Sequence, residues 1–328
     1  MKILVTGSDG FSGSNFCLQA MKDGHQVLGT DLACWFAPKG CRTERLDIRD
    51  QQSCNDICKS FHPDVIIHTA RAPGNLWQIE RDRATTYGIN VLGTRNLAQC
   101  AEELGALFVF LSTDWIFNGS KPVGEKYEED EDACPLCYYG VTKWVAEQTI
   151  VRTVSRWLIL RTAHIYGMHG AVLETPYQKG MNIFRNTVWA GIWDAILKGK
   201  EIFIPDNMYQ TPVLVNNLVE KTLLLLGRAE TGVFHVTDRD CLSRYETVRD
   251  LFSRFGLDGS QIKKGTSMDF AREQGIPPEL ESILPLNSCL NVSKIEKKLG
   301  IKMSVFTEGL EKLVVMLNGL NIDPSRFG

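Results

Sequence analysis

Three regularly spaced glycines follow an apolar run in the stretch Lys2-Ile3-Leu4-Val5-Thr6-Gly7-Ser8-Asp9-Gly10-Phe11-Ser12-Gly13. The run predicts a buried strand over 2–6, and the residues after it predict a helix over 13–23. In such a unit the first glycine permits a tight turn, the second lets backbone N–H groups approach a pyrophosphate, and the third allows close helix–strand packing. The N-terminus of the helix adds partial positive charge for the phosphates. We therefore predict a dinucleotide site rather than a purely structural turn, with cofactor contacts from Gly7, Asp9, Gly10, Phe11, Ser12 and Gly13.

An acidic residue follows the next predicted strand, over 26–30. Asp31 stands at the sequence distance at which a carboxylate accepts hydrogen bonds from ribose hydroxyls. The same carboxylate would repel a 2′-phosphate, which favours NADH. Arg42 and Arg45, in the following loop, could instead receive that phosphate. The sequence therefore predicts NAD or NADP as cofactor, with a preference for NADH.

Other predicted cofactor contacts lie at the ends of later strands and in the reactive segment. Asp47 and Ile48 are placed to meet the adenine, and the segment after the strand over 64–68 passes beneath the pyrophosphate. The remaining contacts that we predict are Thr69, Ala70, Arg71, Asn90, Ser112, Tyr139, Lys143 and His164.

Short β-branched runs alternate with helical stretches through the first half of the chain. Further strands are predicted over 107–112, 157–161 and 232–236, and helices over 50–61, 90–104 and 139–155. Apolar strands separated by helices indicate a parallel sheet covered on both faces and joined by right-handed crossovers.

The second half is less regular, with a helix predicted over 183–197 and several prolines after 238. We expect an α/β protein, namely a doubly wound parallel Rossmann domain and a smaller, discontinuous C-terminal substrate lobe. The dinucleotide-binding domain takes residues 1–167 and 205–237, and the lobe takes 168–204 and 238–328. The cleft between them would hold the substrate.

Composition excludes several classes of partner. The chain has 328 residues, enough for two lobes, and its net charge of −3 has the wrong sign for a nucleic-acid binder. Its apolar runs, such as Leu223-Leu224-Leu225-Leu226, are too short to cross a bilayer. We expect a cytoplasmic protein with no nucleic-acid or membrane partner.

Ten scattered cysteines predict reduced thiols rather than a disulfide framework. Cys134-Pro135-Leu136-Cys137 has redox spacing, but it follows an acidic loop, which disfavours a redox role. No second Cys/His pair lies nearby to complete a zinc site, so we expect no metal.

A reactive group is predicted at Tyr139-Gly140-Val141-Thr142-Lys143. The Tyr139 phenol and the Lys143 ammonium, four residues apart, share one helix face, and the positive charge would lower the pKa of the phenol. The phenol could then give a proton to a carbonyl oxygen. Ser112-Thr113-Asp114 ends the preceding strand, at the sheet edge where ligands bind, and its hydroxyls could hold the same oxygen.

Several stretches together resemble the extended short-chain dehydrogenases/reductases, and within them the dTDP-4-dehydrorhamnose reductases. They are residues 7–13, His68-Thr69-Ala70, Ile89-Asn90-Val91, Ser112-Thr113-Asp114-Trp115-Ile116-Phe117-Asn118-Gly119, residues 139–143, 160–167 and Asn287-Ser288-Cys289-Leu290-Asn291. The resemblance implies reduction of a nucleotide-activated 4-keto-6-deoxy sugar by NAD(P)H, with hydride transfer to C4. It implies Thr113, Tyr139 and Lys143 as catalytic residues, with Tyr139 as proton donor, and substrate contacts from Thr113, Asp114, Trp115, His164 and Arg185. Lys179 and Arg185 would meet the diphosphate, and a homodimer is left open as the assembly.

Two neighbouring chemistries are weighed at single positions, and a third alternative is a binding partner rather than an enzyme. Related nucleotide-sugar dehydratases carry an Asp-Glu pair after the catalytic threonine, whereas Trp115 follows Asp114 here. Related epimerase-reductases have a cysteine in place of Trp115 and a histidine where His169 stands, so only half of that pair is present. The regulatory β subunit of methionine adenosyltransferase shares the motifs and works as a binding partner. The chain also departs from the reductases at Leu284-Pro285, where they have an arginine before the proline.

Overall fold

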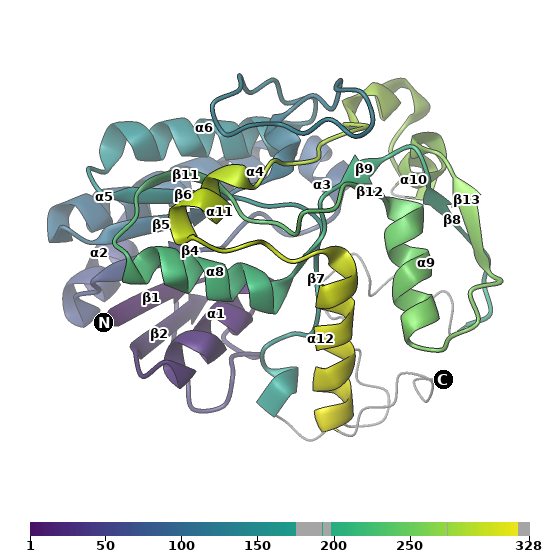
Figure 1. Cartoon of the computed structure of the whole chain (residues 1–328). Helices are drawn as coiled ribbons and strands as arrows, with labels where there is room; N and C mark the ends of the chain where they lie inside the picture. Colours follow the sequence, from purple (N-terminus) through teal and green to yellow (C-terminus); the bar gives the residue numbers. More distant parts are fainter. Residues whose placement is uncertain (175–191, 193–197, 274, 321–328) are drawn as a thin grey trace.

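A seven-stranded, wholly parallel sheet forms the centre of the protein in the computed structural model, which describes residues 1–174, 192, 198–273 and 275–320 (Figure 1). Its order is β11-β6-β5-β4-β1-β2-β3. The strands are β1 (Lys2–Thr6), β2 (Gln26–Asp31), β3 (Arg42–Arg45), β4 (Val65–His68), β5 (Leu107–Leu111), β6 (Trp157–Arg161) and β11 (Gly232–His235). The prediction of a doubly wound Rossmann sheet is confirmed.

Alternate side chains of each strand enter separate hydrophobic cores on the two faces of the sheet. Ile3 and Val5 pack on one face beneath α1 (Phe11–Lys22), α8 (Val215–Gly227) and α11 (Ser293–Leu299). Leu4, between them in β1, packs on the other face beneath α2 (Gln51–Phe61), α5 (Thr94–Leu104) and α6 (Tyr138–Thr153). Burial on both faces explains why these strands read as continuous apolar runs.

The strand order reverses at β1, which pairs with β2 on one side and β4 on the other. The chain therefore leaves the carboxyl ends of β1 and β4 in opposite directions. In doubly wound sheets such a switch point opens a crevice, and ligands bind there. This reversal places the glycine-rich loop after β1 next to the residues that follow β4.

Several local elements differ from the prediction. β3 was not predicted, because its sequence Arg42-Thr43-Glu44-Arg45 is charged, as befits an edge strand. The predicted helix over 90–104 is divided into a π-helical turn, η1 (Gly88–Gly93), and α5. Two unpredicted short helices, α3 (Leu76–Arg81) and α4 (Arg83–Tyr87), begin at side-chain caps from Asn75 and Asp82.

The remaining elements gather beyond the carboxyl edge of the sheet (Figure 1). They include three small pairs of strands: β7 (Ile165–Tyr166) with β10 (Val213–Leu214), β8 (Ile202–Pro205) with β13 (Ile262–Gly265), and β9 (Tyr209–Gln210) with β12 (Leu242–Ser243). The helices here are η2 (Asp114–Ile116), η3 (Val172–Glu174), α9 (Arg244–Arg254), α10 (Ser267–Glu273), η4 (Pro278–Ile283) and α12 (Phe306–Gly319). A separate hydrophobic core joins β8 and β13 to α9 and α12. The domain boundaries stay a prediction. Lys179, Arg185 and nearly all of the helix predicted over 183–197 lie outside the described residues.

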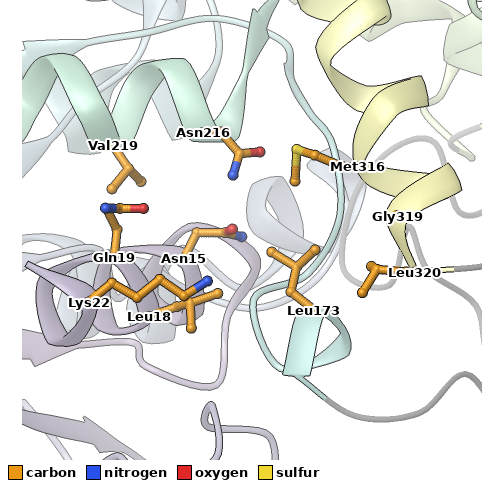
Figure 2. A pocket seen from close by; sticks show the side chains of 10 residues that line it. All are labelled: Asn15, Leu18, Gln19, Lys22, Leu173, Asn216, Val219, Met316, Gly319 and Leu320. Atoms are coloured by element: carbon orange, nitrogen blue, oxygen red, sulfur yellow. The ribbon is translucent and has the colours of Figure 1, made fainter.

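A cavity of about 280 Å³ opens between α1, α8 and α12 (Figure 2). Its lining mixes apolar side chains such as Leu18 and Met316 with the Lys22 ammonium and the amides of Asn15, Gln19 and Asn216. None of the ten residues that line it is a predicted site residue.

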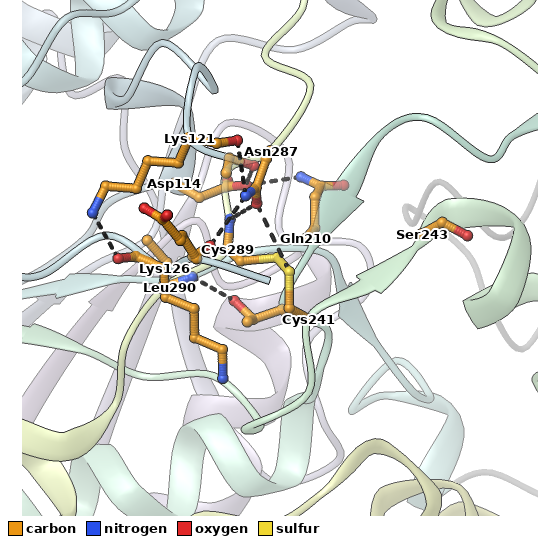
Figure 3. The surroundings of a disulfide bond; sticks show 12 residues. Asp114, Lys121, Lys126, Gln210, Cys241, Ser243, Asn287, Cys289 and Leu290 are labelled. Atoms are coloured by element: carbon orange, nitrogen blue, oxygen red, sulfur yellow. Dashed lines mark hydrogen bonds between the residues drawn. A yellow bond between two sulfur atoms is a disulfide. The ribbon is translucent and has the colours of Figure 1, made fainter. Parts of the chain in front are cut away.

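Cys241 and Cys289 form a disulfide across a sequence separation of 48 residues, so the prediction that all thiols are reduced is wrong for this pair (Figure 3). β12 pairs with β9, and Tyr209 of β9 in turn forms a bridge with Asn287. These pairings bring the segment before β12 beside the segment after Pro285. Spacing along the chain gave no sign of this tertiary contact.

The disulfide predicts a measurable loss of stability in Cys241→Ser. A cross-link of this span lowers the entropy of the unfolded chain and contributes about 4 kcal/mol on the chain-entropy model. Chemical denaturation should show a lower unfolding free energy for Cys241→Ser. The control is Cys134→Ser, because Cys134 is exposed and free, and it should leave the value unchanged. Equal stabilities for Cys241→Ser and the parent would contradict the disulfide.

Candidate active site

The glycine-rich loop between β1 and α1 is held tightly against the sheet. The N–H groups of Gly7 and Ser8 donate to the Thr30 carbonyl of β2 at 2.8 and 3.1 Å. Gly13 lies so close to this turn that an added Cβ would stand 2.0 Å from the Gly7 carbonyl oxygen. α1 begins at Phe11, and no side chain caps its first N–H groups, since Gly10 is the N-cap residue. The loop thus presents backbone donors and a helix N-terminus, which suits a pyrophosphate.

Asp31, at the carboxyl end of β2, is tied to the same loop. Its Oδ2 accepts from the Asp9 N–H at 3.1 Å and its Oδ1 from the Leu32 N–H at 2.7 Å. Burial raises the pKa of Asp31, while these two N–H donors lower it. Arg42 pairs with Glu44 at 2.5 Å, and Arg45 is the register partner of Asp31 on β3. The predicted ribose acid and the predicted phosphate-binding arginines therefore share one corner of the sheet.

The segment after β4 closes the other side of the crevice. Thr69 Oγ1 donates to the Thr6 carbonyl at 2.8 Å, and the Ala70 backbone lies against Gly7. Asn90 accepts from the Ala72 N–H at 2.7 Å and donates to Thr142 of α6 at 2.9 Å. The structure thus brings Thr69 and Ala70 to the loop, whereas the Asn90 amide links the backbone after β4 to α6.

Asp47 and Ile48 lie at the end of the segment that follows β3. Asp47 forms an ion pair with Arg49 at 2.6 Å, which lowers the pKa of the Asp47 carboxyl. Ile48 is buried beside Gly93 of η1, where an added Cβ would stand 2.6 Å from the Ile48 side chain. The Ile48 side chain is therefore part of the core.

Tyr139 and Lys143 lie in the first two turns of α6. Cys137 caps this helix, its Sγ accepting from the Gly140 N–H at 3.4 Å, and burial raises the pKa of the Cys137 thiol to about 12. Lys143 Nζ donates to the Leu111 carbonyl at 2.6 Å and lies 3.8 Å from the centre of the Phe110 ring. Lys143 is thereby fixed at the carboxyl end of β5. Cys137 thus acts as the N-cap of α6.

The ionisation of this pair differs from the prediction. Burial raises the pKa of Tyr139, and the charge that counters this is Arg71, with a smaller lowering by the neighbouring Thr113 side chain, rather than Lys143. Burial also lowers the pKa of Lys143 to about 7, against the opposing influence of Glu147. The expected lowering of the phenol pKa by Lys143 is therefore wrong, because desolvation outweighs the charges.

A close approach positions Thr113 beside Tyr139. An added Cβ at Gly140 would stand 2.1 Å from the Trp115 carbonyl oxygen, so only glycine lets α6 approach η2 this closely. Thr113 Oγ1 donates to Asp114 at 3.0 Å and accepts from the Trp115 N–H at 3.2 Å. Thr113, Tyr139 and Lys143 therefore converge at the carboxyl end of β5.

Ser112 and Asp114 are engaged by protein groups. Ser112 donates to Glu147, which forms a buried ion pair with Arg161 at 2.8 Å. Asp114 is only 2% exposed and accepts from Gln210 at 2.8 Å (Figure 3). It also accepts from Ser288 and Thr113. Both side chains were predicted as ligand contacts, but in this structure they support their neighbours.

Two histidines that the sequence singled out, His164 and His169, lie in different surroundings. His164 has a positive φ of 41°, and burial lowers the pKa of its imidazole to about 3, so it is neutral. His169 is buried beneath the glycine-rich loop, with Nε2 3.0 Å from the Asp9 carbonyl oxygen and 3.4 Å from Ser14 Oγ. His169 therefore supports the cofactor loop, which removes the half-pair considered for epimerisation.

Sequence reasoning missed Gln210, Ser288, Arg244 and Glu147, which surround the reactive group. Gln210 ends β9, Arg244 begins α9 and Ser288 follows Pro285, and only the tertiary fold brings these distant segments close to Asp114. Glu147 had a usable signal, since it lies four residues after Lys143 on the same helix face.

Two further searches cover the described residues only. No group of three or more His, Cys, Asp or Glu is arranged there to hold a metal ion. Over the same part of the chain, no helix combines the length and apolar character needed to cross a bilayer.

Comparison with known proteins gives a consistent family. The family model described as RmlD substrate binding domain matches residues 1–318. The dTDP-4-dehydrorhamnose reductase of Aggregatibacter actinomycetemcomitans is 26% identical over 314 residues, which cover 95% of this chain and 98% of that one. Methionine adenosyltransferase 2 subunit beta of Pongo abelii is 24% identical over 322 residues, covering 95% and 89%.

Solved structures share the fold. The dTDP-4-dehydrorhamnose reductase of Bacillus anthracis, in complex with NADP, superimposes with a TM-score of 0.78 at 22% identity, covering 96% of this chain and 98% of that one. UDP-glucose 4-epimerase of Thermus thermophilus, in complex with NAD, gives a TM-score of 0.76 at 22% identity, covering 97% and 99%.

Proposed function

The chain belongs to the RmlD substrate binding domain family, and on that premise we propose that it is an NAD(P)H-dependent reductase of a nucleotide-activated 4-keto-6-deoxy sugar. One observation carries the proposal: Thr113, Tyr139 and Lys143 meet at the carboxyl end of β5, on the same edge of the sheet as the glycine-rich loop. The dTDP-4-dehydrorhamnose reductases among its relatives support the sugar class.

The crevice residues fit a nicotinamide dinucleotide. The uncapped first turn of α1 would hold the pyrophosphate, Asp31 the adenosine ribose and Lys143 the nicotinamide ribose. Phe11, Ser12, Thr69, Ala70 and Arg71 would also contact the cofactor, and we keep the remaining predicted contacts as part of the proposal. When bound, the reduced cofactor supplies the hydride.

The chain's own groups would handle the substrate oxygen. The Thr113 hydroxyl would turn its proton from Asp114 to the carbonyl oxygen at C4, and Tyr139 would donate a proton to that oxygen from the phenol. The raised pKa of Tyr139 keeps this proton in place at neutral pH. Trp115 and the neutral His164 would contact the sugar, as would Arg185, which lies outside the described residues. Asp114 would act by orienting Thr113.

Cofactor preference is the finer part of the proposal, and it predicts the behaviour of Asp31→Ala. The parent should prefer NADH, because the Asp31 carboxylate would repel a 2′-phosphate. Removing the carboxylate should lower the ratio of kcat/KM with NADH to kcat/KM with NADPH. Steady-state kinetics with both cofactors gives the ratio. A parent enzyme that strongly prefers NADPH would contradict this assignment and indicate that Arg45 binds the 2′-phosphate.

A direct test of the reaction is NADH oxidation with dTDP-4-keto-6-deoxy sugars that differ in stereochemistry. A reductase consumes NADH and, in deuterated water, leaves C3 and C5 of the product unlabelled. Deuterium at C3 or C5 would indicate epimerisation before reduction. Conversion of a dTDP-hexose that still has its 6-hydroxyl to a 4-keto-6-deoxy sugar would instead indicate a dehydratase. No NADH oxidation with any of these sugars would reject the proposal.

A second candidate function follows from the methionine adenosyltransferase β subunits among the relatives. A chain of this kind binds a cofactor and acts as the partner of a larger enzyme. Co-purification with a methionine adenosyltransferase catalytic subunit, without ketone reduction, would favour it. A homodimer and a cytoplasmic location also remain predictions, and the Cys241–Cys289 disulfide is unusual for the cytoplasm.

A further inference from the structure

Arg244, the first residue of α9, is a charged side chain placed inside the protein next to the reactive group. It is only 8% exposed. Its guanidinium carbon lies 4.4 Å from the centre of the Phe270 ring and 6.0 Å from the centre of the Trp115 ring. Burial lowers the pKa of Arg244 to about 10, so the group stays charged at neutral pH.

The charge of Arg244 has little compensation within the protein. Its Nε donates to the Gln210 Oε1 at 3.1 Å. Among the described residues no carboxylate forms an ion pair with it, and its two terminal nitrogens have no hydrogen-bond partner. These nitrogens are not sealed inside the protein. Buried charges in proteins are normally paired, so the guanidinium is suited to bind an anion.

Asp114 is an internal anion close enough for its charge to raise the pKa of Arg244, but no hydrogen bond or ion pair joins the two side chains. It receives hydrogen bonds from Thr113, Gln210 and Ser288. Gln210 stands between the two charges: its amide N–H₂ group donates to Asp114, and its carbonyl oxygen accepts from Arg244 (Figure 3 shows the Asp114 side). Gln210 therefore fixes the plane of the guanidinium and leaves its outer edge for a ligand.

The position of Arg244 relative to Tyr139 defines which part of a substrate reaches it. Trp115 lies beside both groups: its ring centre is 6.4 Å from that of Tyr139 and 6.0 Å from the Arg244 guanidinium carbon. A sugar whose carbonyl oxygen meets Tyr139 would therefore lie next to Trp115. The group attached to the far side of that sugar would then meet Arg244.

We propose that Arg244 binds a phosphate of the nucleotide diphosphate, gripping it with the two terminal nitrogens of its guanidinium. The fork of an arginine matches two oxygens of one phosphate, and such charge-assisted hydrogen bonds are the stronger kind. This inference rests on the proposed function for the sugar and names the residue that holds the substrate's anionic end.

Isothermal titration of the NADH-loaded protein with dTDP and with thymidine tests the proposal. NADH occupies the glycine-rich loop, so dTDP cannot report on that phosphate site. The parent should bind dTDP more tightly than thymidine. Arg244→Gln should reduce dTDP affinity by roughly ten- to a hundredfold and leave thymidine affinity unchanged. Arg244→Lys, which keeps the charge without the fork, should fall between the two.

Arg249→Gln is the matched control, because Arg249 lies on the same helix, is exposed and pairs with Asp250. It should bind dTDP like the parent. NADH affinity reports whether each variant is folded. If Arg244→Gln does not fold, Arg244→Lys replaces it as the variant that tests the phosphate contact. An unchanged ratio of dTDP to thymidine affinity in a folded Arg244 variant would overturn the proposal.

This binding experiment contains no keto sugar, so its result is separate from that of the reaction. Loss of dTDP binding in Arg244→Gln, together with no reduction by the parent, would support the anion site and reject the reductase. Normal reduction with an unchanged substrate KM in Arg244→Gln would reject the anion site and keep the reductase.

Discussion

Tyr139→Phe should reduce keto sugar roughly a hundred- to ten-thousandfold more slowly than the parent, while NADH binds with unchanged affinity. The variant keeps the ring and loses the proton that the phenol gives to the carbonyl oxygen, and general acids typically contribute a factor of this size. Because the ring packs against Trp115 and its neighbours, the fold should persist. The measurement is kcat for NADH oxidation, with NADH affinity from fluorescence titration.

The adjacent tyrosine gives the control for this substitution. Tyr138 lies one residue earlier on α6, where its ring contacts Arg83 at 4.8 Å rather than Thr113. Tyr138→Phe should keep the parent rate. If both variants were equally fast, Tyr139 would not be the proton donor.

Gly13→Ala should weaken NADH binding by roughly ten- to a hundredfold. The new Cβ would stand 2.0 Å from the Gly7 carbonyl oxygen and 2.9 Å from the Thr69 hydroxyl oxygen. The first of these is backbone, so the loop itself must move, and overpacking of this kind costs about 1–3 kcal/mol. Since the pyrophosphate site is made of this backbone, the cost should appear in cofactor affinity, measured by titration with NADH.

Gly227→Ala is the matching control, because an added Cβ there meets no atom within 4 Å. It should bind NADH like the parent. Unchanged NADH affinity in Gly13→Ala would show that the cofactor does not use the turn between β1 and α1.

The sequence predicted the parts of the structure that local pattern determines. Buried strands such as β1 and β4 read as apolar runs, and the glycine spacing of residues 7–13 identified the turn. The helical spacing of Tyr139 and Lys143 placed both at one end of α6. The edge strand β3 was not predicted, because an edge strand needs no apolar pattern and its charged sequence resembles that of a loop.

The unpredicted features depend on contacts between distant segments. The Cys241–Cys289 disulfide and the contacts of Asp114 with Gln210 and Ser288 join residues that lie 48, 96 and 174 positions apart. The pKa of Tyr139 was predicted from one neighbouring charge, whereas burial dominates it in the folded chain. Desolvation depends on the packing around a group, which neither spacing nor composition reports.

The central claim is direct hydride transfer from the cofactor to C4 of a keto sugar beside Tyr139. Its most direct test is reaction of dTDP-4-keto-6-deoxy sugar with NADH that carries deuterium at C4 of the nicotinamide on the transferred face, followed by NMR of the product. Each face of the nicotinamide is labelled in a separate experiment. The account predicts that one of the two labelled cofactors gives one deuterium at C4 of the reduced sugar and that the other gives none. A sugar recovered unreduced and without deuterium from either face would contradict it.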